Sequence, residues 1–490
     1  MADGGWRTDL ANAARSRAVW VGFAGSLCIL LGSLSPAYLP QASPIWNWLP
    51  RSGPGLATVR WTGTVLTLLG LMALLEAWFR LRPAARRRRG RTPLRNWAVL
   101  AIVASPLLVA PPVFSHDAYS YVAHGWLLHN NLDPYQVGPG ALPGYFADQV
   151  AWVWRETPAP YGPLALRTSH LLVILAGFDP VWAALLHRLP ALVGVGFIGY
   201  FVPRIARLVG VSRSGASWFA TLNPILIIDF IGGAHNDSLM TGLMVFGIWL
   251  TLRFRSWWAG AVVIGVATAI KQPALLAAVA LPFMVRPWTS WRAKPLAAAM
   301  GRALASLAVA AIVFVAITWA TGLGFGWINA TDVPGKVDTV SPVTILGRVL
   351  QYPATALGWD PTGSAVFDVV RKLGVVAMVV GMVWFAILYL GRRPIRFVSW
   401  SLLWFSLTAP ALHSWYLLWG GVLLPMTSPG RRTVRAAIVA TVVLLAYNAL
   451  NFGIRNGLWV VMLILVGAAY WTIHTHELSQ PIDDEESVFT

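Results

Sequence analysis

Charged residues and cysteines are both scarce in this 490-residue sequence. Asp, Glu, Lys and Arg make up 11% of the chain and apolar side chains 57%, whereas soluble globular domains carry roughly 25% charged residues. A soluble protein would need an implausibly large core for this composition, which excludes an ordinary soluble enzyme, and also a disordered chain or a collagen. The single cysteine, Cys28, lies in an apolar run, so an intrachain disulfide and a cysteine-based metal site are excluded. These absences indicate a polytopic membrane protein.

Several functional signatures are missing as well. The sequence contains no GxxxxGK(S/T), HExxH or GxSxG pattern and no Gly-rich nucleotide fingerprint. A site for ATP or a nucleotide sugar is therefore not visible. We also find no internal repeat and no inverted half-to-half repeat, which transporters often have.

The sequence does contain a series of long apolar runs. A transmembrane helix needs about 20 mainly apolar residues, and on this criterion we predict an all-α, polytopic integral membrane protein with about 13–14 transmembrane helices. The pairs of runs within 257–286 and 397–427 could each be a broken hairpin. The predicted spans are 17–36, 56–79, 96–115, 181–202, 215–231, 238–252, 257–270, 272–286, 303–322, 366–390, 397–412, 415–427, 435–453 and 457–473.

The positions of the basic residues predict the orientation. The chain has 37 Lys and Arg against 19 Asp and Glu, and the cations concentrate in alternate connections, which is typical of cytoplasmic loops. Both termini are therefore expected in the cytoplasm of a plasma-membrane protein. Most acids outside the two ends of the chain fall in the opposite connections. Two causes remain open: acids suit Arg-rich inner loops poorly near anionic lipid, or the polar work of the protein is done outside.

We predict one polytopic domain over 1–476, followed by an acidic cytoplasmic tail over 477–490. Its two long external loops are 116–180 and 323–365, and loops of such length are usually functional or disordered. In the first loop, aromatic residues argue against disorder, 118–129 has helical potential, and 164–178 is predicted to be a helix on the outer interface. The second loop, with Asp332, Lys336 and Asp338, is a candidate lid.

The first candidate site is the sequence Ser-His-Asp-Ala-Tyr-Ser-Tyr over 115–121, directly after a predicted span. A carboxylate at this boundary, partly shielded from water, is suited to act as a general base on a hydroxyl. The alternative interpretation is that Asp117 caps the helix that starts at Ala118.

Two further candidates lie at the same boundary. His235-Asn236-Asp237 follows two glycines and is suited to bind sugar hydroxyls, but it could also be a turn followed by a helix cap. Lys271 interrupts a long apolar stretch just before Pro273. It would pair with a phosphate, and the alternative is a lysine that extends to the lipid headgroups.

The last candidate is His413 with Trp415 and Tyr416, again at an outer span end. The imidazole is suited to donate to a phosphate or a sugar oxygen, whereas the two aromatic residues alone would be interfacial belt residues. Arg188 and Arg455 are weaker cases of the same kind. The shared side and depth of these groups favour a single site.

At these positions the chain resembles the polyprenyl-phosphate-sugar-dependent glycosyltransferases of the GT-C class. It most resembles the actinobacterial α-1,6-mannosyltransferases that build lipomannan. The resemblance covers most of 96–427. It is carried by Asp117 in the first large external loop, Leu-Asp-Pro-Tyr at 132–135, Tyr-Gly-Pro-Leu at 161–164, His-Arg-Leu-Pro at 187–190, Asn-Pro at 223–224, His235-Asn236-Asp237, Lys271, and His413 with Trp415-Tyr416.

The resemblance implies an inverting transfer of mannose from polyprenyl-phosphate-mannose at the extracytoplasmic face, forming α-1,6 linkages in lipomannan or lipoarabinomannan. The implied acceptor is a mannosylated phosphatidylinositol or lipomannan, and no nucleic acid is involved. Asp117 would be the catalytic base, and Lys271, His413 and Arg455 would bind the donor phosphate. The residues implied to contact sugar or acceptor are His116, Tyr121, Tyr135, His235, Asn236, Asp237, Trp415 and Tyr416.

No cofactor is implied by the resemblance. Dependence on a divalent metal stays open, because His116 stands where the family often has a second acid. Three alternatives remain from the sequence: a transporter or flippase of a lipid-linked sugar, a GT-C arabinofuranosyltransferase, and a non-catalytic scaffold for cell-wall assembly.

Overall fold

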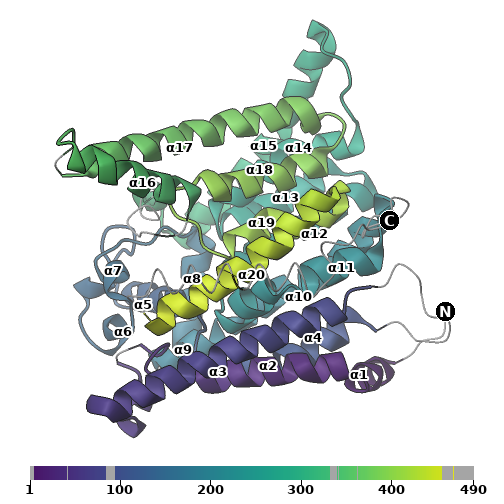
Figure 1. Cartoon of the computed structure of the whole chain (residues 1–490). Coiled ribbons are helices and arrows are strands. Elements are labelled where there is room, and N and C mark those ends of the chain that lie inside the picture. The colour runs from purple at the N-terminus through teal and green to yellow at the C-terminus, as the bar shows by residue number, and fades with distance from the viewer. Residues whose placement is uncertain are drawn as a thin grey trace.

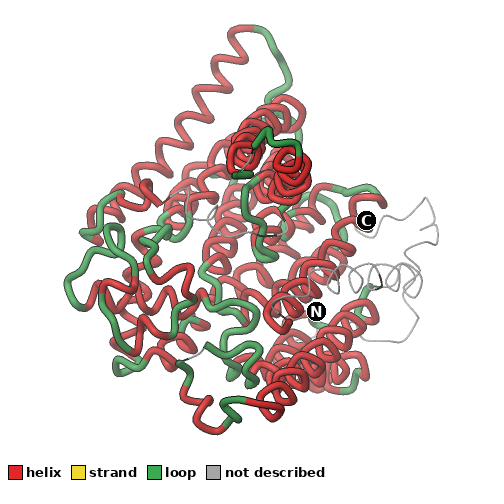
Figure 2. Tube along the Cα trace, turned by 60° about the vertical axis from the view of Figure 1, so that its left-hand side comes forward, coloured by secondary structure: helices red, strands yellow, loops and turns green. Residues whose placement is uncertain are grey.

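A computed structural model describes residues 5–40, 42–83, 94–330, 339, 341–360, 362–454 and 467 of the chain. Over these residues the protein consists of helices and connecting loops, without strands, as Figures 1 and 2 show. The predicted all-α membrane fold is confirmed.

Among the described residues, five helical segments are long and apolar enough to cross a membrane, or up to seven if two bent pairs each count as one span. These are α3 (Gly53–Arg80), α9 (Pro180–Leu186) joined to α10 (Arg188–Leu208), α15 (Ala293–Thr321), α17 (Ser364–Phe385) joined to the π-helical turn η8 (Ala386–Leu390), and α20 (Arg431–Ile454). The bent pairs are α1 (Trp6–Ala14) with α2 (Arg17–Ser33), at 83°, and α11 (Arg213–Thr221) with the π-helical turn η4 (Leu226–Gly232), at 54°.

Shorter helices account for the remaining predicted spans that fall on described residues, and each of these spans overlaps helical residues. The last predicted span, 457–473, lies outside the described residues. The shorter helices are α4 (Asn96–Ala104), η2 (Ser105–Leu108), α12 (Asp237–Phe254), α13 (Trp257–Thr268), η5 (Gln272–Leu275), α14 (Leu276–Val285), α18 (Pro394–Thr408), α19 (Tyr416–Gly421) and η9 (Leu424–Thr427).

The segment 116–180 folds over one end of the helical bundle, on the left in Figure 1. The two helices predicted there are confirmed as α5 (Asp117–His129) and α8 (Pro163–Leu175). Between them lie η3 (Pro139–Ala141), α6 (Tyr145–Asp148) and α7 (Trp152–Arg155); η1 (Pro44–Trp48) precedes α3.

The segment 323–365 contains η6 (Gly326–Ala330) and a helix that was not predicted, α16 (Pro342–Ala356). The acids and the lysine of the candidate lid, Asp332, Lys336 and Asp338, lie outside the described residues.

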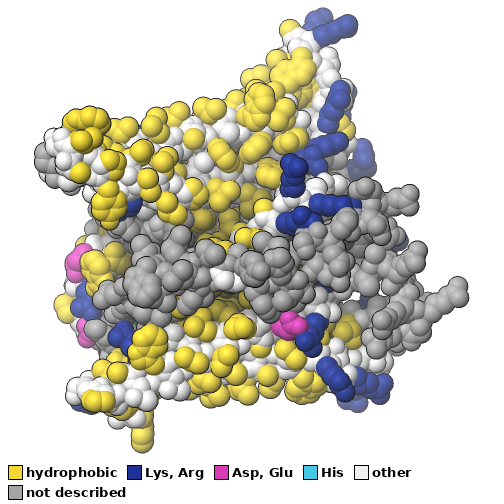
Figure 3. Space-filling model, viewed as in Figure 1, with side chains coloured by type: hydrophobic (Ala, Val, Ile, Leu, Met, Phe, Trp, Pro, Cys, Tyr) yellow, Lys and Arg dark blue, Asp and Glu magenta, His cyan; other side chains and the backbone are white. Residues whose placement is uncertain are grey.

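Charge is distributed unevenly along the bundle. On the face shown in Figure 3, Lys and Arg side chains gather at the end of the helices opposite to the folded segment 116–180. This arrangement agrees with basic loops on one side of a bilayer and the polar segment on the other.

The N-terminal hairpin packs through small residues. A Cβ atom on Gly25 would lie 2.7 Å from the carbonyl oxygen of Gly70, so α2 and α3 approach closely there, as membrane helices with small residues do. Near the C-terminal end of α3, the Trp78 ring stacks on the Trp218 ring of α11 with 5.0 Å between centroids. This second contact joins the hairpin to the central helices.

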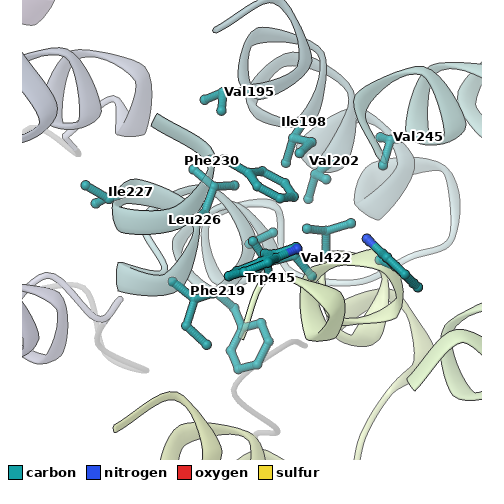
Figure 4. Packing of buried hydrophobic residues seen from close by; sticks show 14 of the residues in the cluster. Val195, Ile198, Val202, Phe219, Leu226, Ile227, Phe230, Val245, Trp415 and Val422 are labelled. Atoms are coloured by element: carbon teal, nitrogen blue, oxygen red, sulfur yellow. The ribbon is translucent and has the colours of Figure 1, made fainter. Parts of the chain in front are cut away.

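The central core surrounds the η4 turn and the segment before α19. Figure 4 shows Trp415 pointing into this core close to Phe230 and Val422. Phe230 and Val422 are completely buried, and Trp415 is 5% exposed. Trp415, for which an interfacial belt position was the alternative to a sugar contact, is therefore part of the packed interior.

Candidate active site

Two chain segments that are distant in sequence run side by side at the end of the bundle that carries 116–180. The Val113 amide donates to the Gly232 carbonyl at 3.2 Å. Each segment then passes through a non-glycine residue in the left-handed region, Phe114 with φ 56° and Ala234 with φ 56°. Such backbone is costly and is found where the surroundings enforce it, often at functional sites. The motifs that begin at Ser115 and His235 follow directly.

Arg188 holds these two segments together. Its guanidinium donates to the carbonyls of Ala110 at 2.6 Å, Gly232 at 2.8 Å and Ile231 at 3.1 Å. The side chain is 3% exposed, so its positive charge interacts with backbone oxygens within the protein. Arg188, which the sequence suggested as a weaker boundary charge, thus connects the chain before Asp117 with the chain before His235.

Asp117 is the partly exposed acid of this site. Its side chain is 20% exposed, and its Oδ2 lies 3.8 Å from Nδ1 of the fully buried His235. The hydroxyl of Tyr121 lies 3.2 Å from the same nitrogen. Burial raises the pKa of Asp117 from its usual value to about 6, although the charge of Lys271 lowers it. The carboxyl group is thus suited to exchange a proton near neutral pH.

Lys271 and Asp237 form a buried ion pair next to Asp117. Lys271 Nζ donates to both carboxylate oxygens at 2.9 Å, and the Trp419 indole donates to Asp237 at 2.7 Å. The ammonium group also lies 4.9 Å from the centre of the Tyr416 ring, within cation–π distance. The Asp237 side chain is completely buried, whereas that of Lys271 is 13% exposed, so the cation is the accessible partner.

Three rings form a column between Asp117 and the segment before α19. Trp415 stacks on His235 with 3.8 Å between ring centroids and on His413 with 4.4 Å. His413 also meets the Tyr416 ring edge-on at 5.1 Å. Burial, with a smaller effect of Lys271, lowers the pKa of His413 to about 3. His413 is therefore neutral at physiological pH and offers a hydrogen bond instead of a positive charge.

Next to this column lies a chain of buried polar side chains that was not predicted as a site. Ser414 donates to Asp229 Oδ2, and Asn448 of α20 donates to Ser414 at 2.7 Å. Asp229 is completely buried, and its Oδ1 has no hydrogen-bond partner among the described residues. The sequence feature that could have predicted Asp229 is an acid inside the apolar run Ile-Ile-Asp-Phe-Ile, because charges at membrane depth commonly mark function.

The segment that carries His413 is fixed by the start of α16. Ser341 donates to the Pro410 carbonyl at 2.9 Å, and Thr344 donates to the same oxygen at 2.5 Å. The Leu412 amide donates to Thr339 at 2.8 Å. The second long loop therefore contacts the site through Thr339, Ser341 and Thr344.

The other predicted residues lie around this centre. His116 faces the Tyr38 carbonyl at 2.8 Å and the ring of Phe452 at 5.6 Å. Tyr135 is buried in a separate small cluster, and its hydroxyl donates to the Tyr161 carbonyl at 2.9 Å. Arg455 lies outside the described residues.

Asn236 lines a small pocket between α8, α10 and α12, together with Ser169 and Leu239. Its buried Oδ1 has no partner in the part of the chain that the structure describes.

Across the described ranges, no group of three or more His, Cys, Asp or Glu side chains is placed to hold a metal ion.

The geometry thus joins a proton-exchanging carboxyl, an accessible ammonium and a neutral imidazole at one end of a membrane bundle. Residues 19–290, more than half of the chain, match the family model described as "Alpha-(1->6)-mannopyranosyltransferase, N-terminal domain". The chain belongs to the alpha-(1->6)-mannopyranosyltransferase family. Residues 343–476 match a second model, described as "MptB C-terminal domain".

Curated relatives cover most of this mannosyltransferase. Alpha-(1->6)-mannopyranosyltransferase A of Mycobacterium tuberculosis is 32% identical over 431 residues, covering 85% of this chain and 81% of the relative. The A enzyme of Corynebacterium glutamicum is 31% identical, covering 66% of this chain and 69% of the relative. The B enzyme of the same organism is 26% identical, covering 92% and 79%.

Both matched regions of the mannosyltransferase contribute to the site. Asp117, His235 and Lys271 come from the first region, and His413 and Trp415 come from the second. The 3.8 Å stack between His235 and Trp415 bridges the two regions. Neither matched region alone therefore contains the whole set of candidate residues.

Proposed function

We propose that this chain is an inverting α-1,6-mannosyltransferase of the plasma membrane. It takes mannose from polyprenyl-phosphate-mannose and transfers it to a mannosylated lipid or glycan at the extracytoplasmic face. The observation that carries the proposal is the partly exposed carboxyl of Asp117, whose pKa is sensitive to the nearby charge of Lys271. A base and an accessible cation in one site suit a reaction in which a hydroxyl loses a proton while a phosphate leaves.

Asp117 acts as the general base. With a pKa of about 6 it is ionised at neutral pH, and it accepts the proton of the acceptor's 6-hydroxyl. The acceptor oxygen then bonds to the anomeric carbon as the bond from that carbon to the phosphate oxygen breaks. A single displacement inverts the configuration, so a β-linked mannosyl phosphate gives an α-mannoside.

Lys271 and His413 stabilise the leaving polyprenyl phosphate. Asp237 holds the ammonium group in place, and the exposed part of Lys271 remains available to the growing negative charge. His413 contributes a neutral N–H, because its pKa is lowered to about 3. Two donors of different charge at one phosphate favour release of an anion without binding it too strongly.

The proposed orientation places Asp117 outside and both termini in the cytoplasm. It is supported by the gathering of Lys and Arg at the opposite end of the bundle (Figure 3) and by the positive-inside tendency of membrane proteins. The proposed acceptor is mannosylated phosphatidylinositol or lipomannan, which would be extended towards lipomannan and lipoarabinomannan.

The test uses purified full-length protein with labelled polyprenyl-phosphate-mannose and a mannosylated phospholipid, followed by linkage analysis. We expect α-1,6-linked product from the wild type and none from Asp117→Asn, with donor binding retained. Asp148→Asn is the matched control, because Asp148 lies on α6 of the same external segment, with 52% of its side chain exposed.

Wild-type turnover by Asp117→Asn would remove this residue as the base. Product from a polyprenyl-phosphate-arabinose donor only would reassign the sugar. Movement of the labelled donor across vesicles without acceptor, with no product, would favour a flippase.

A further inference from the structure

The imidazole of His235 lies beside the proposed base, and it cannot touch a sugar directly in this structure. The residue is completely buried, and its Nδ1 lies 3.8 Å from Asp117 Oδ2 and 3.2 Å from the Tyr121 hydroxyl. The sequence suggested His235 as a sugar contact. Its position behind Asp117 favours an action on the carboxyl group itself.

The ring of His235 is held in one orientation. Trp415 stacks on it with 3.8 Å between centroids and 23° between planes. On the backbone side, the left-handed Ala234 precedes it, and the His235 amide donates to the Asp229 carbonyl at 3.4 Å. Stacking and backbone geometry thus hold the ring with its Nδ1 facing both Asp117 and the Tyr121 hydroxyl.

The environment also selects a tautomer. Nε2 is buried and has no hydrogen-bond partner within the described ranges. Because Nε2 is unpartnered in either tautomer, the difference between the tautomers lies at Nδ1. A bare Nδ1 would turn its lone pair towards the Asp117 carboxylate, whereas a hydrogen on Nδ1 faces the oxygens of Asp117 and Tyr121. The negative charge of the carboxylate therefore favours the neutral ring with hydrogen on Nδ1.

We propose that His235 is a positioning residue for Asp117. The Nδ1–H of His235 holds one carboxylate oxygen of Asp117, so that the other oxygen faces the acceptor hydroxyl. The proposal rests on the proposed function of Asp117 as base. The 3.8 Å separation shortens to a hydrogen bond when the acceptor binds, as catalytic contacts that are long in unliganded proteins commonly do.

The proposal has a consequence for the pH profile. A hydrogen bond to the charged form of a carboxyl lowers its pKa, so removal of the Nδ1–H raises the pKa of Asp117. The acidic limb of the pH profile, which is the range in which kcat falls as the pH is lowered, then moves to higher pH. The other titratable groups that influence Asp117, or are influenced by it, come from several elements: Tyr121 on α5, Tyr161 before α8, Asp237 on α12, Lys271 before η5 and Tyr416 on α19. They are unchanged in the variants below.

Three substitutions separate the hydrogen bond from the stacking. His235→Asn keeps an amide N–H near the position of Nδ1, His235→Gln moves it towards Nε2, and His235→Phe keeps a ring on Trp415 without any N–H. We expect His235→Phe and His235→Gln to lower kcat about tenfold or more and to move the acidic limb up by about one pH unit. The KM for a mannosylated phospholipid acceptor changes little.

We expect His235→Asn to keep the acidic limb at its wild-type position. The control is His124→Phe, which removes another buried histidine of the external segment, one that faces the Thr157 carbonyl and not Asp117. It is expected to leave the limb in place even if it lowers the melting temperature.

If all three His235 variants lose activity with an unmoved acidic limb, His235 is only structural and the proposal fails. An increase of acceptor KM with unchanged kcat would instead make His235 part of the sugar site and would also overturn it. Failure of the proposed function is distinguishable, because it appears as activity in Asp117→Asn.

Discussion

Lys271 and Asp237 form a two-pronged ion pair in which the ammonium nitrogen lies 2.9 Å from each carboxylate oxygen. The acid is completely buried and also accepts the Trp419 indole N–H, whereas the cation keeps an exposed part. The sequence suggested Asp237 as a contact for sugar. In the structure Asp237 faces the lysine, so the pair holds the lysine for another ligand.

The two partners of this pair are therefore expected to respond differently to substitution. Lys271→Met leaves a buried carboxylate without its cation, which destabilises by about 3–5 kcal/mol, and it removes the proposed phosphate contact. Asp237→Asn keeps an oxygen that accepts from both the Trp419 indole and the ammonium group, so Lys271 stays in place. We expect Lys271→Met to abolish transfer, and Asp237→Asn to keep donor KM within about threefold of wild type, below about 1 kcal/mol.

Donor and acceptor KM values, with thermal unfolding in detergent, measure this difference. The double variant serves as the control for the pairwise contribution to stability. A large rise of acceptor KM in Asp237→Asn, with donor KM unchanged, would restore the sugar-binding role and contradict the prediction.

The pKa of Asp117 predicts the acidic limit of activity. Burial raises this pKa to about 6, and only the ionised carboxylate can accept the hydroxyl proton. We therefore expect kcat to fall about tenfold for each unit of pH below 6 and to level off above about pH 7. His413 does not contribute to this limb, because its pKa is lowered to about 3.

The pH dependence is measured with saturating donor in the purified protein. A limb near pH 4, the usual value for an aspartate, would show that Asp117 is hydrated during turnover and would contradict the buried environment. Stability is expected to depend on pH in the opposite direction to kcat, because protonation of a carboxyl with a raised pKa favours the folded state. Asp117→Asn is therefore expected to unfold at the same or a higher temperature than wild type.

Hydropathy and charge were sufficient to predict much of the fold. Apolar runs predicted spans that overlap helices, and capping and turn residues predicted α5 and α8. The helix α16 was missed because it contains Pro353 and lies in a Gly-Pro-rich loop. Such a helix depends on its contacts with neighbouring elements more than on its own propensity.

The site was predicted only in part. The candidate residues could be gathered on one side because their positions along the chain share a boundary. The pairings could not be predicted: Trp415 stacks on His235, and Ser414 donates to Asp229, a residue 185 positions away. Contacts between distant segments depend on packing of the whole bundle, and a single sequence carries no direct signal for them.

The last prediction concerns Arg188 and tests whether this residue acts through its hydrogen-bond geometry or through its positive charge. It donates to three carbonyls on the segments that precede Asp117 and His235. A lysine cannot reproduce this planar fork. We therefore expect Arg188→Lys and Arg188→Met to lower kcat by similar factors of about tenfold or more, since a shift of about 1 Å between base and acceptor is costly.

The control is Arg204→Met on the same helix, whose guanidinium is exposed and donates to the Tyr200 carbonyl within its own helix. It should retain wild-type kcat and melting temperature. Arg188→Lys with near wild-type kcat would instead show that the positive charge is what matters, as expected for a group that acts on the donor phosphate. Because the fork spans both segments, we expect the lysine variant to fail, and steady-state kinetics of the three variants at one pH decide the matter.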